Sequence, residues 1–206
     1  MLENIIEFYS IASNLKNIIR TGWSEVGIPT EKIETVAEHV YGCNLLAMCI
    51  AGEYKLDLNM EKVFKMLTIK ELTKAITQEI SVISGNKAEN SRNIILSITE
   101  KLTSKDELLE IYDEYTAQET PEAKFALYVS KFESDLQAKL YDINGDFKLE
   151  NAIEDIKNYP EELKESILPT IENASDGWLQ YNRTYYNDSE IFMKLSKDLQ
   201  KYKGRN

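Results

Sequence analysis

Histidine, cysteine, proline and glycine are all scarce in this sequence: its 206 residues contain one histidine, two cysteines, four prolines and eight glycines. His39, Cys43 and Cys49 therefore do not form the repeated ligand pairs of a structural zinc site. Both cysteines fall on one predicted helix with their side chains pointing in different directions, which excludes a disulfide between them. We interpret them as reduced core residues.

Basic residues are also few: the sequence has 24 lysines and arginines and 35 acidic residues, which gives a net charge of −11. This balance argues against a binder of nucleic acid or anionic membranes, since both need a basic surface. The net charge is still compatible with a local basic pocket that binds a small phosphate. Long apolar runs are missing as well: residues 1–4 do not resemble a signal peptide, and no later segment is apolar enough to span a bilayer. We expect a cytosolic protein with no membrane partner.

Apolar residues recur at three- and four-residue spacing along most of the chain, which predicts an all-α fold. We find no internal repeat or linker and expect a single domain over residues 1–206. A capping box is also predicted at Ser104 and Glu107. The expected helices span about 4–19, 36–53, 60–80, 86–102 (or from 91), 105–115, 121–140, 151–159, 161–168 and 189–202.

The segment Glu34–His39 contains the only histidine and a second capping box, formed by Thr35 and Glu38. In this motif the hydroxyl accepts from the Glu38 amide and the carboxylate accepts from the Thr35 amide, so a helix begins at Val36. His39 then lies one turn inside that helix, on its apolar face. A hydrogen-bonded core histidine is the simplest interpretation. Cys43 shares that face, but it belongs to the buried series, which disfavours a Cys-His nucleophile.

Several motifs in consistent order give this chain a resemblance to a known family. They lie between about residues 15 and 141, and the remaining residues, 142–206, form a predicted helical C-terminal extension. The sequence resembles the HD-domain phosphohydrolases of the 5′-deoxynucleotidase type. The motifs are Leu15-Lys16, Arg20-Thr21-Gly22-Trp23, Glu34-Thr35-Val36-Ala37-Glu38-His39, Met66-Leu67, Glu119-Thr120-Pro121-Glu122-Ala123, Lys131-Phe132-Glu133 and Gln137-Ala138.

The resemblance implies a divalent metal held by a first histidine, a His-Asp pair and a late aspartate. His39 matches the first histidine. The family's His-Asp pair corresponds to Lys70-Glu71 in this chain, and its late aspartate corresponds to Ser130. The family also has an acid four residues after the histidine of the pair, where this chain has Lys74, and a Gly-Asp, where this chain has Gln78-Glu79. A lysine ammonium has no lone pair and repels a dication, and serine offers only a neutral oxygen.

These substitutions predict a degenerate HD-domain protein with no cofactor and no catalytic residue, acting as a regulatory pseudoenzyme. It would bind a nucleotide or another phosphorylated small molecule, with Arg20 as a bidentate phosphate donor and Trp23 as a stacking wall. The resemblance also implies a homodimer. The predicted ligand-binding residues are Arg20, Trp23, His39, Lys70, Glu71, Lys74 and Ser130.

Two other functions stay open. The first is an active phosphohydrolase on nucleoside monophosphates, whose altered divalent-metal site would use His39, Glu71 and Glu79. The second is a protein–protein interaction module that uses the acidic surface and the aromatic C-terminal segment.

Overall fold

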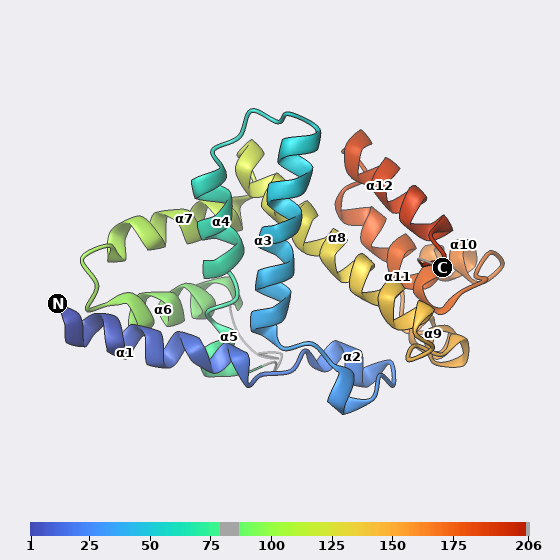
Figure 1. Cartoon of the computed structure of the whole chain (residues 1–206), viewed down its shortest axis with the longest axis horizontal. Coiled ribbons are helices and arrows are strands. Elements are labelled where there is room, and N and C mark those ends of the chain that lie inside the picture. Colours follow the sequence, from blue (N-terminus) through green and yellow to red (C-terminus); the bar gives the residue numbers. More distant parts are fainter. Residues whose placement is uncertain (79–86, 205–206) are drawn as a thin grey trace. The chain divides into compact units, whose positions relative to one another are not determined.

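The chain is built from helices, as the apolar spacing predicted (Figure 1). The computed structural model describes residues 1–78 and 87–204, with side chains described from residue 90 onward in the second range. Within these ranges the only extended pairing is an isolated bridge between Ile19 and Thr35. The α-helices are α1 (Leu2–Ala12), α2 (Thr21–Glu25), α3 (Val36–Glu53), α4 (Met60–Ile69), α5 (Lys74–Thr77), α6 (Lys87–Thr99), α7 (Lys105–Ala117), α8 (Pro121–Ile143), α9 (Leu149–Ile156), α10 (Glu161–Ile167), α11 (Ala174–Asn182) and α12 (Glu190–Lys201).

The described residues divide into two compact units. The first unit comprises residues 1–20 and 34–129, and the second comprises 21–33 and 130–206. The boundary falls inside α8, so it does not coincide with the end of the family resemblance near residue 141. The single domain over residues 1–206 stays a prediction.

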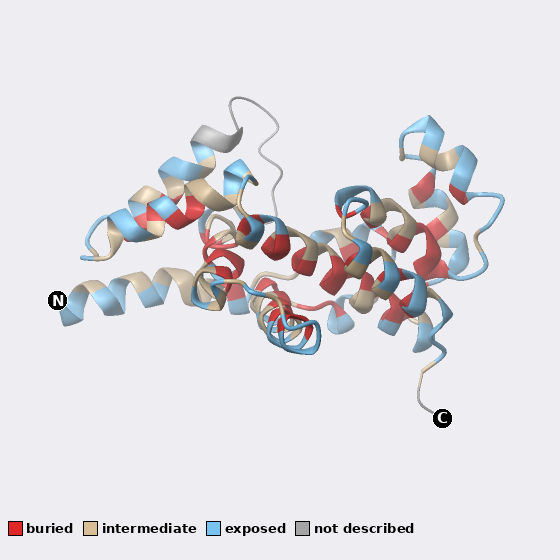
Figure 2. Cartoon of the chain, turned by 90° about the horizontal axis from the view of Figure 1, so that it is seen from above, coloured by how far each residue is buried: buried red, intermediate tan, exposed pale blue. Residues whose placement is uncertain are grey.

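The first unit buries the facing sides of α3, α4, α6 and α7, and α3 lies beside α4 in Figure 1. Helix α1 differs from its prediction, because it ends at Ala12 and none of its residues is buried (Figure 2). It is held by Asn4, which donates to the Lys101 carbonyl, and by an ion pair between Lys101 and Glu7. The core of the unit includes Val36, Cys43, Ala47, Val63, Met66, Leu67, Ile95 and Leu109.

Helix α4 is shorter than the predicted helix over 60–80. It begins at Met60, as predicted, with Asn59 as its cap, and ends at Ile69. The amides of Glu71 and Leu72 bond three residues back instead of four, to the carbonyls of Thr68 and Ile69. This tighter turn ends the α-helix. Lys70 and Lys74 therefore do not lie within one continuous helix, which corrects the predicted helix over 60–80.

The second unit is organised around Trp23. Its indole stacks on Trp178 at 4.4 Å between ring centroids and meets Tyr141 edge-on at 5.2 Å. Helix α11, which the sequence analysis missed, packs on α9. A Cβ on Gly177 would lie 2.7 Å from Ile156 Cδ1, so glycine permits this close helix contact. The core also contains Ile167, Leu179, Tyr186 and Phe192.

Most predicted helix starts are confirmed. The Thr35–Glu38 capping box is formed in full at the start of α3. Thr120 accepts from the Ala123 amide at the start of α8, and Ser189 accepts from the Phe192 amide at the start of α12. The predicted box at Ser104 and Glu107 is wrong, because the Ser104 side chain makes no capping bond. In the part of the chain that the structure describes, no helix has the length and apolarity needed to cross a bilayer.

Candidate functional site

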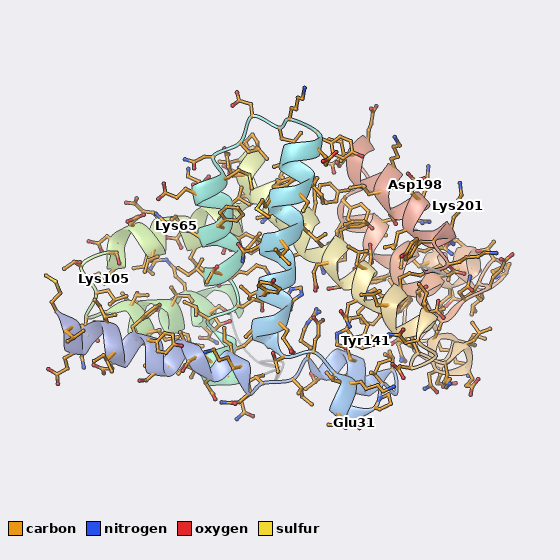
Figure 3. The ribbon with its side chains drawn as sticks, in the orientation of Figure 1. Glu31, Lys65, Lys105, Tyr141, Asp198 and Lys201 are labelled. Atoms are coloured by element: carbon orange, nitrogen blue, oxygen red, sulfur yellow. The ribbon has the colours of Figure 1, made fainter. Side chains whose placement is uncertain are left out.

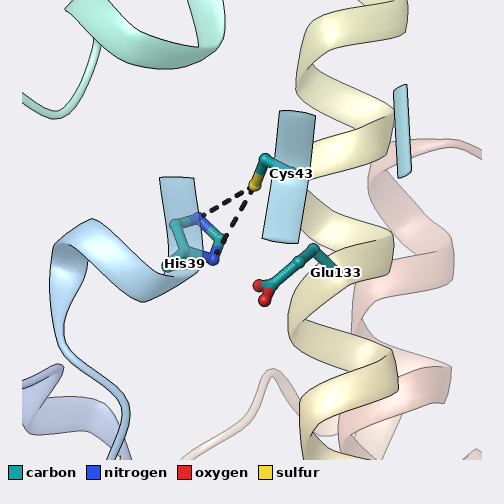
Figure 4. A group of neighbouring side chains, drawn as sticks. All are labelled: His39, Cys43 and Glu133. Carbon is teal, nitrogen blue, oxygen red and sulfur yellow. Dashed lines mark hydrogen bonds between the residues drawn. The ribbon is translucent and has the colours of Figure 1, made fainter. Parts of the chain in front are cut away.

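His39 lies inside the first unit, and the capping box of α3 fixes its position one turn into the helix. Its side chain is 2% exposed. One turn further along α3, the Cys43 sulfur approaches the two ring nitrogens at 3.5 Å (Nε2) and 3.8 Å (Nδ1), as Figure 4 shows. A carboxylate oxygen of Glu71 lies 3.7 Å from Nε2. The imidazole therefore faces a thiol and an acid.

The charges around His39 favour its neutral form. Burial is the main cause that lowers the pKa of His39 well below its usual value, and the cations Arg20, Lys70 and Lys74 lower it further. Glu71 acts in the opposite direction without reversing the result. A neutral imidazole keeps a lone pair, so His39 can serve as a metal ligand or a hydrogen-bond acceptor.

Glu71 lies among three basic side chains. Lys70 Nζ donates to one of its oxygens, and Lys74 Nζ lies 3.0 Å from the other. Burial alone would raise the pKa of Glu71, but Lys70, Lys74 and His39 together hold it well below its usual value. The carboxylate is thus charged and already engaged. Glu71 is therefore the countercharge of both Lys70 and Lys74.

Arg20 is fixed next to the start of α3 by backbone pairing. Its amide donates to the Glu34 carbonyl, and the Val36 amide donates to the Ile18 carbonyl. The Arg20 guanidinium also forms an ion pair with the Glu34 carboxylate at 2.5 Å, and both side chains are largely buried. The first unit therefore brings Arg20, His39, Lys70, Glu71 and Lys74 into one electrostatic network, although they come from separate segments.

The other predicted site residues lie elsewhere in the chain. Trp23 belongs to the second unit and is 1% exposed, with one ring face covered by Trp178. That packing gives the indole a structural role, and its role as a ligand-stacking wall stays a prediction. Ser130 is a buried residue of α8, and its carbonyl accepts from the Ser134 hydroxyl. Glu79 lies outside the described residues.

Two buried side chains of the first unit offer the kinds of atom that ligate divalent metals: His39 an imidazole nitrogen and Cys43 a sulfur (Figure 4). Glu133, a buried residue of the second unit, carries a carboxylate, which is a further group of ligating type. The donor chemistry suits an ion such as Zn²⁺, which accepts nitrogen, thiolate and carboxylate ligands. Sequence reasoning missed two of them. The four-residue spacing of His39 and Cys43 was visible but interpreted as packing, and Glu133 belongs to a family motif without an assigned role.

The model of the HD domain family matches residues 12–172 of this chain. A 5′-deoxynucleotidase HDDC2 from Dictyostelium discoideum is 29% identical over 163 residues, which cover 74% of this chain and 84% of that protein. The 5′-deoxynucleotidase hdd1 of Schizosaccharomyces pombe is 30% identical over 155 residues, which cover 69% of this chain and 76% of that protein. The resemblance drawn from the motifs is confirmed.

Solved structures share the fold at lower sequence identity. A conserved hypothetical protein from Pyrococcus furiosus aligns with a TM-score of 0.63 at 20% identity, covering 96% of this chain and 99% of that one. A protein from Magnetospirillum magnetotacticum, described as a predicted metal-dependent phosphohydrolase, aligns with a TM-score of 0.56 at 17% identity, covering 97% and 94%. These likenesses establish the fold.

The prediction that the protein has no cofactor is wrong. A protein of the same fold is described as a predicted metal-dependent phosphohydrolase, and this chain retains buried side chains of metal-ligating types at His39, Cys43 and Glu133. The error came from counting only the family's own ligand positions. The homodimer and the cytosolic location stay predictions.

Proposed function

This chain belongs to the HD domain family, and from that membership we propose that it is a phosphohydrolase acting on nucleoside monophosphates, with a changed set of metal ligands. The observation that carries the proposal is the buried, neutral His39 among ligating and basic side chains. The names of the curated relatives, 5′-deoxynucleotidases, support the substrate class.

In this proposal His39 and Cys43 hold a divalent ion together with a carboxylate, for which the first unit offers Glu71, with an oxygen 3.7 Å from His39 Nε2. A bound divalent ion polarises a phosphoryl oxygen and lowers the pKa of bound water. To bind the ion, Glu71 has to release a lysine, because Lys70 and Lys74 already engage its two oxygens. The ligand set therefore differs from the one that the family resemblance implied.

The basic side chains of the same network receive the phosphate of the substrate. Arg20 presents a planar guanidinium, which can bind two phosphate oxygens at once. Lys74 is 27% exposed and adds a point charge that can reach an entering phosphate. Lys70 is only 8% exposed, so its ammonium acts through the field it exerts on its neighbours.

A second candidate function, binding of a nucleotide without turnover, is favoured by Lys70 itself. Its ammonium lies at the first position of the family's His-Asp pair, where it offers no lone pair to a metal. The same network of Arg20, Lys70 and Lys74 would then hold a phosphate as a ligand. This is the regulatory pseudoenzyme that the sequence predicted.

Metal analysis and phosphate release distinguish the two candidates. The full chain, purified without chelator, is incubated with deoxynucleoside monophosphates in the presence of Mn²⁺, Co²⁺ or Zn²⁺, and bound metal and free phosphate are measured. If the protein is a phosphohydrolase, it binds metal and releases phosphate. Both the metal content and the phosphate release then fall in His39→Ala. Nucleotide-dependent thermal stabilisation without turnover supports binding alone; ligand at a hundred times its Kd adds about 2.7 kcal/mol.

Lys74→Gln and Lys105→Gln form a matched pair for the phosphate-binding step. Lys74 belongs to the network, whereas Lys105 is a partly exposed lysine at the start of α7. Weakened nucleotide affinity in the first variant alone supports the assigned role. Equal affinity in both variants would contradict it, whichever of the two candidate functions holds.

A further inference from the structure

The second unit contains a cavity of about 520 Å³ that takes no part in the proposed reaction. It lies where the start of α11, the last turn of α12 and α8 come together. Its volume is in the range of small-molecule sites, which is about 300–1,000 Å³. The charged residues that line it are Lys139, Glu172, Asp176, Lys197, Lys201 and Lys203.

The charge of this lining is opposite to that of the whole chain. Four lysines and two acids line the cavity, whereas the chain carries −11 overall. Lys197 and Lys201 come from α12, and Figure 3 shows Lys201 near the end of that helix. Lysines that line one cavity repel one another, which is unfavourable unless a bound anion neutralises part of their charge. The lining is therefore suited to an anionic ligand.

Lys139 is a buried member of this lining, which distinguishes the cavity from a group of exposed surface lysines. Its side chain is 5% exposed, and its ammonium lies 3.8 Å from Asp142 Oδ2. Nζ also donates to the Gln200 carbonyl at 3.3 Å. The position of this cation is thus fixed by α8 and α12 before any ligand enters.

Asp176 supplies the second observation that indicates a ligand. Its Oδ2 accepts from the amides of Glu172 and Asn173 at 3.0 and 2.8 Å, which completes the start of α11. Its Oδ1 is buried and accepts no hydrogen bond from any described residue. A buried acceptor without a donor is unfavourable, because it has lost its hydrogen bonds to water. A hydroxyl donor on a ligand in the cavity would satisfy it.

We propose that this cavity binds a phosphorylated small molecule that carries hydroxyl groups, such as a sugar phosphate or a nucleotide. The lysines hold the phosphoryl group, and Asp176 Oδ1 accepts a hydrogen bond from a hydroxyl. A bare divalent cation is disfavoured by the four ammonium groups. A nucleic-acid polymer is disfavoured because the rest of the chain is acidic.

Titration calorimetry on the full chain tests the proposal, with ribose 5-phosphate, inorganic phosphate and ribose as probes. We expect ribose 5-phosphate to bind more tightly than either fragment. Lys197→Gln with Lys201→Gln should weaken the binding of ribose 5-phosphate by about a hundredfold or more, since each lost charge-assisted bond lowers the affinity at least about tenfold. Lys194→Gln, an exposed lysine of α12 outside the cavity, is the matched control and should bind like the wild type.

Asp176→Asn tests the hydroxyl contact separately. Asparagine keeps one oxygen for the two amides at the start of α11, so the helix start is preserved, and a thermal melt checks this. We expect the variant to lose the preference for ribose 5-phosphate over inorganic phosphate. The proposal is overturned if the wild-type protein does not bind ribose 5-phosphate, or if the double lysine variant binds it as tightly as Lys194→Gln. His39→Ala should leave this binding unchanged, so failure here is distinguishable from failure of the phosphohydrolase proposal.

Discussion

The Lys70 ammonium donates to the carboxylate of its neighbour in the chain, Glu71, and both side chains are less than one-tenth exposed. Removing two charges from water costs several kcal/mol per ion, and only a close partner offsets that cost. The pair therefore depends on both members. The pKa of Lys70 reflects this: burial opposes the charged form, but Glu71 raises the pKa above its usual value.

Removal of one member of this pair is expected to be strongly destabilising. Glu71→Gln leaves the Lys70 ammonium buried without its countercharge, which should lower the free energy of unfolding by about 3–5 kcal/mol. Urea denaturation measures the change. Glu61→Gln, which removes an exposed partner of Lys65, is the control and should have a much smaller effect. Lys70→Met added to Glu71→Gln should recover part of the loss. Equal losses in Glu71→Gln and Glu61→Gln would contradict a buried pair.

The two cysteines allow a test of metal ligation that does not depend on activity. Cys43 is buried beside His39, whereas Cys49 is exposed on the same helix. If Cys43 ligates the ion as a thiolate, the Co²⁺-loaded protein should show a near-ultraviolet sulfur-to-cobalt charge-transfer band. Cys43→Ser should abolish that band and lower the metal content, and Cys49→Ser should change neither. A band that survives in Cys43→Ser would exclude Cys43 as a ligand.

Asp135 is expected to make stability depend on pH. Burial raises the pKa of Asp135 to about 8, although hydrogen bonds from Tyr186 and Asn182 favour its charged form. The folded state then binds a proton that the unfolded state, with a pKa of about 3.9, releases. Stability contributed by this group is fully present below pH ~4 and is lost as pH rises toward 8.

Asp135→Asn removes this titration while keeping a side chain of the same shape. Between pH 5 and 7 the wild type should lose about 1.4 kcal/mol per pH unit relative to the variant. Chemical denaturation across that range measures the difference. Asp198→Asn, on the exposed side of α12, serves as the reference substitution. Parallel pH profiles for wild type and Asp135→Asn would mean that Asp135 is ionised in the folded protein.

A comparison of alanine substitutions at Gly27 and Gly145 distinguishes the effect of backbone strain from that of steric crowding. Both have a positive φ, 77° and 74°, which a side chain adopts at a cost of about 1–2 kcal/mol. A Cβ on Gly27 would also lie 2.3 Å from Asn151 Nδ2, whereas one on Gly145 meets nothing within 4 Å. Gly27→Ala should therefore be the more destabilising in thermal melts, and Asn151→Ala should restore part of the difference. Equal losses at the two glycines would rule out the crowding.

Sequence reasoning predicted the helical class and most helix starts, because caps and apolar spacing act over a few residues. The Thr35–Glu38 box forms as expected, and α4 begins at Met60 as predicted. Where neighbours outside the segment decide the outcome, the predictions were less accurate. The apolar series over 60–80 is interrupted after Ile69, and α11, with a glycine packed on Ile156, gave no recognisable apolar pattern.

The same distinction applies to the site. The residue types alone identified His39 as the family histidine and Lys70-Glu71 as a departure from its metal-binding pair. Only the tertiary structure decided that Glu71 is shared by two lysines, that Trp23 is a core indole and that Asp176 keeps a buried oxygen in a lysine-lined cavity. Burial and charge partners arise when distant segments pack together, and the local pattern of a sequence does not encode them.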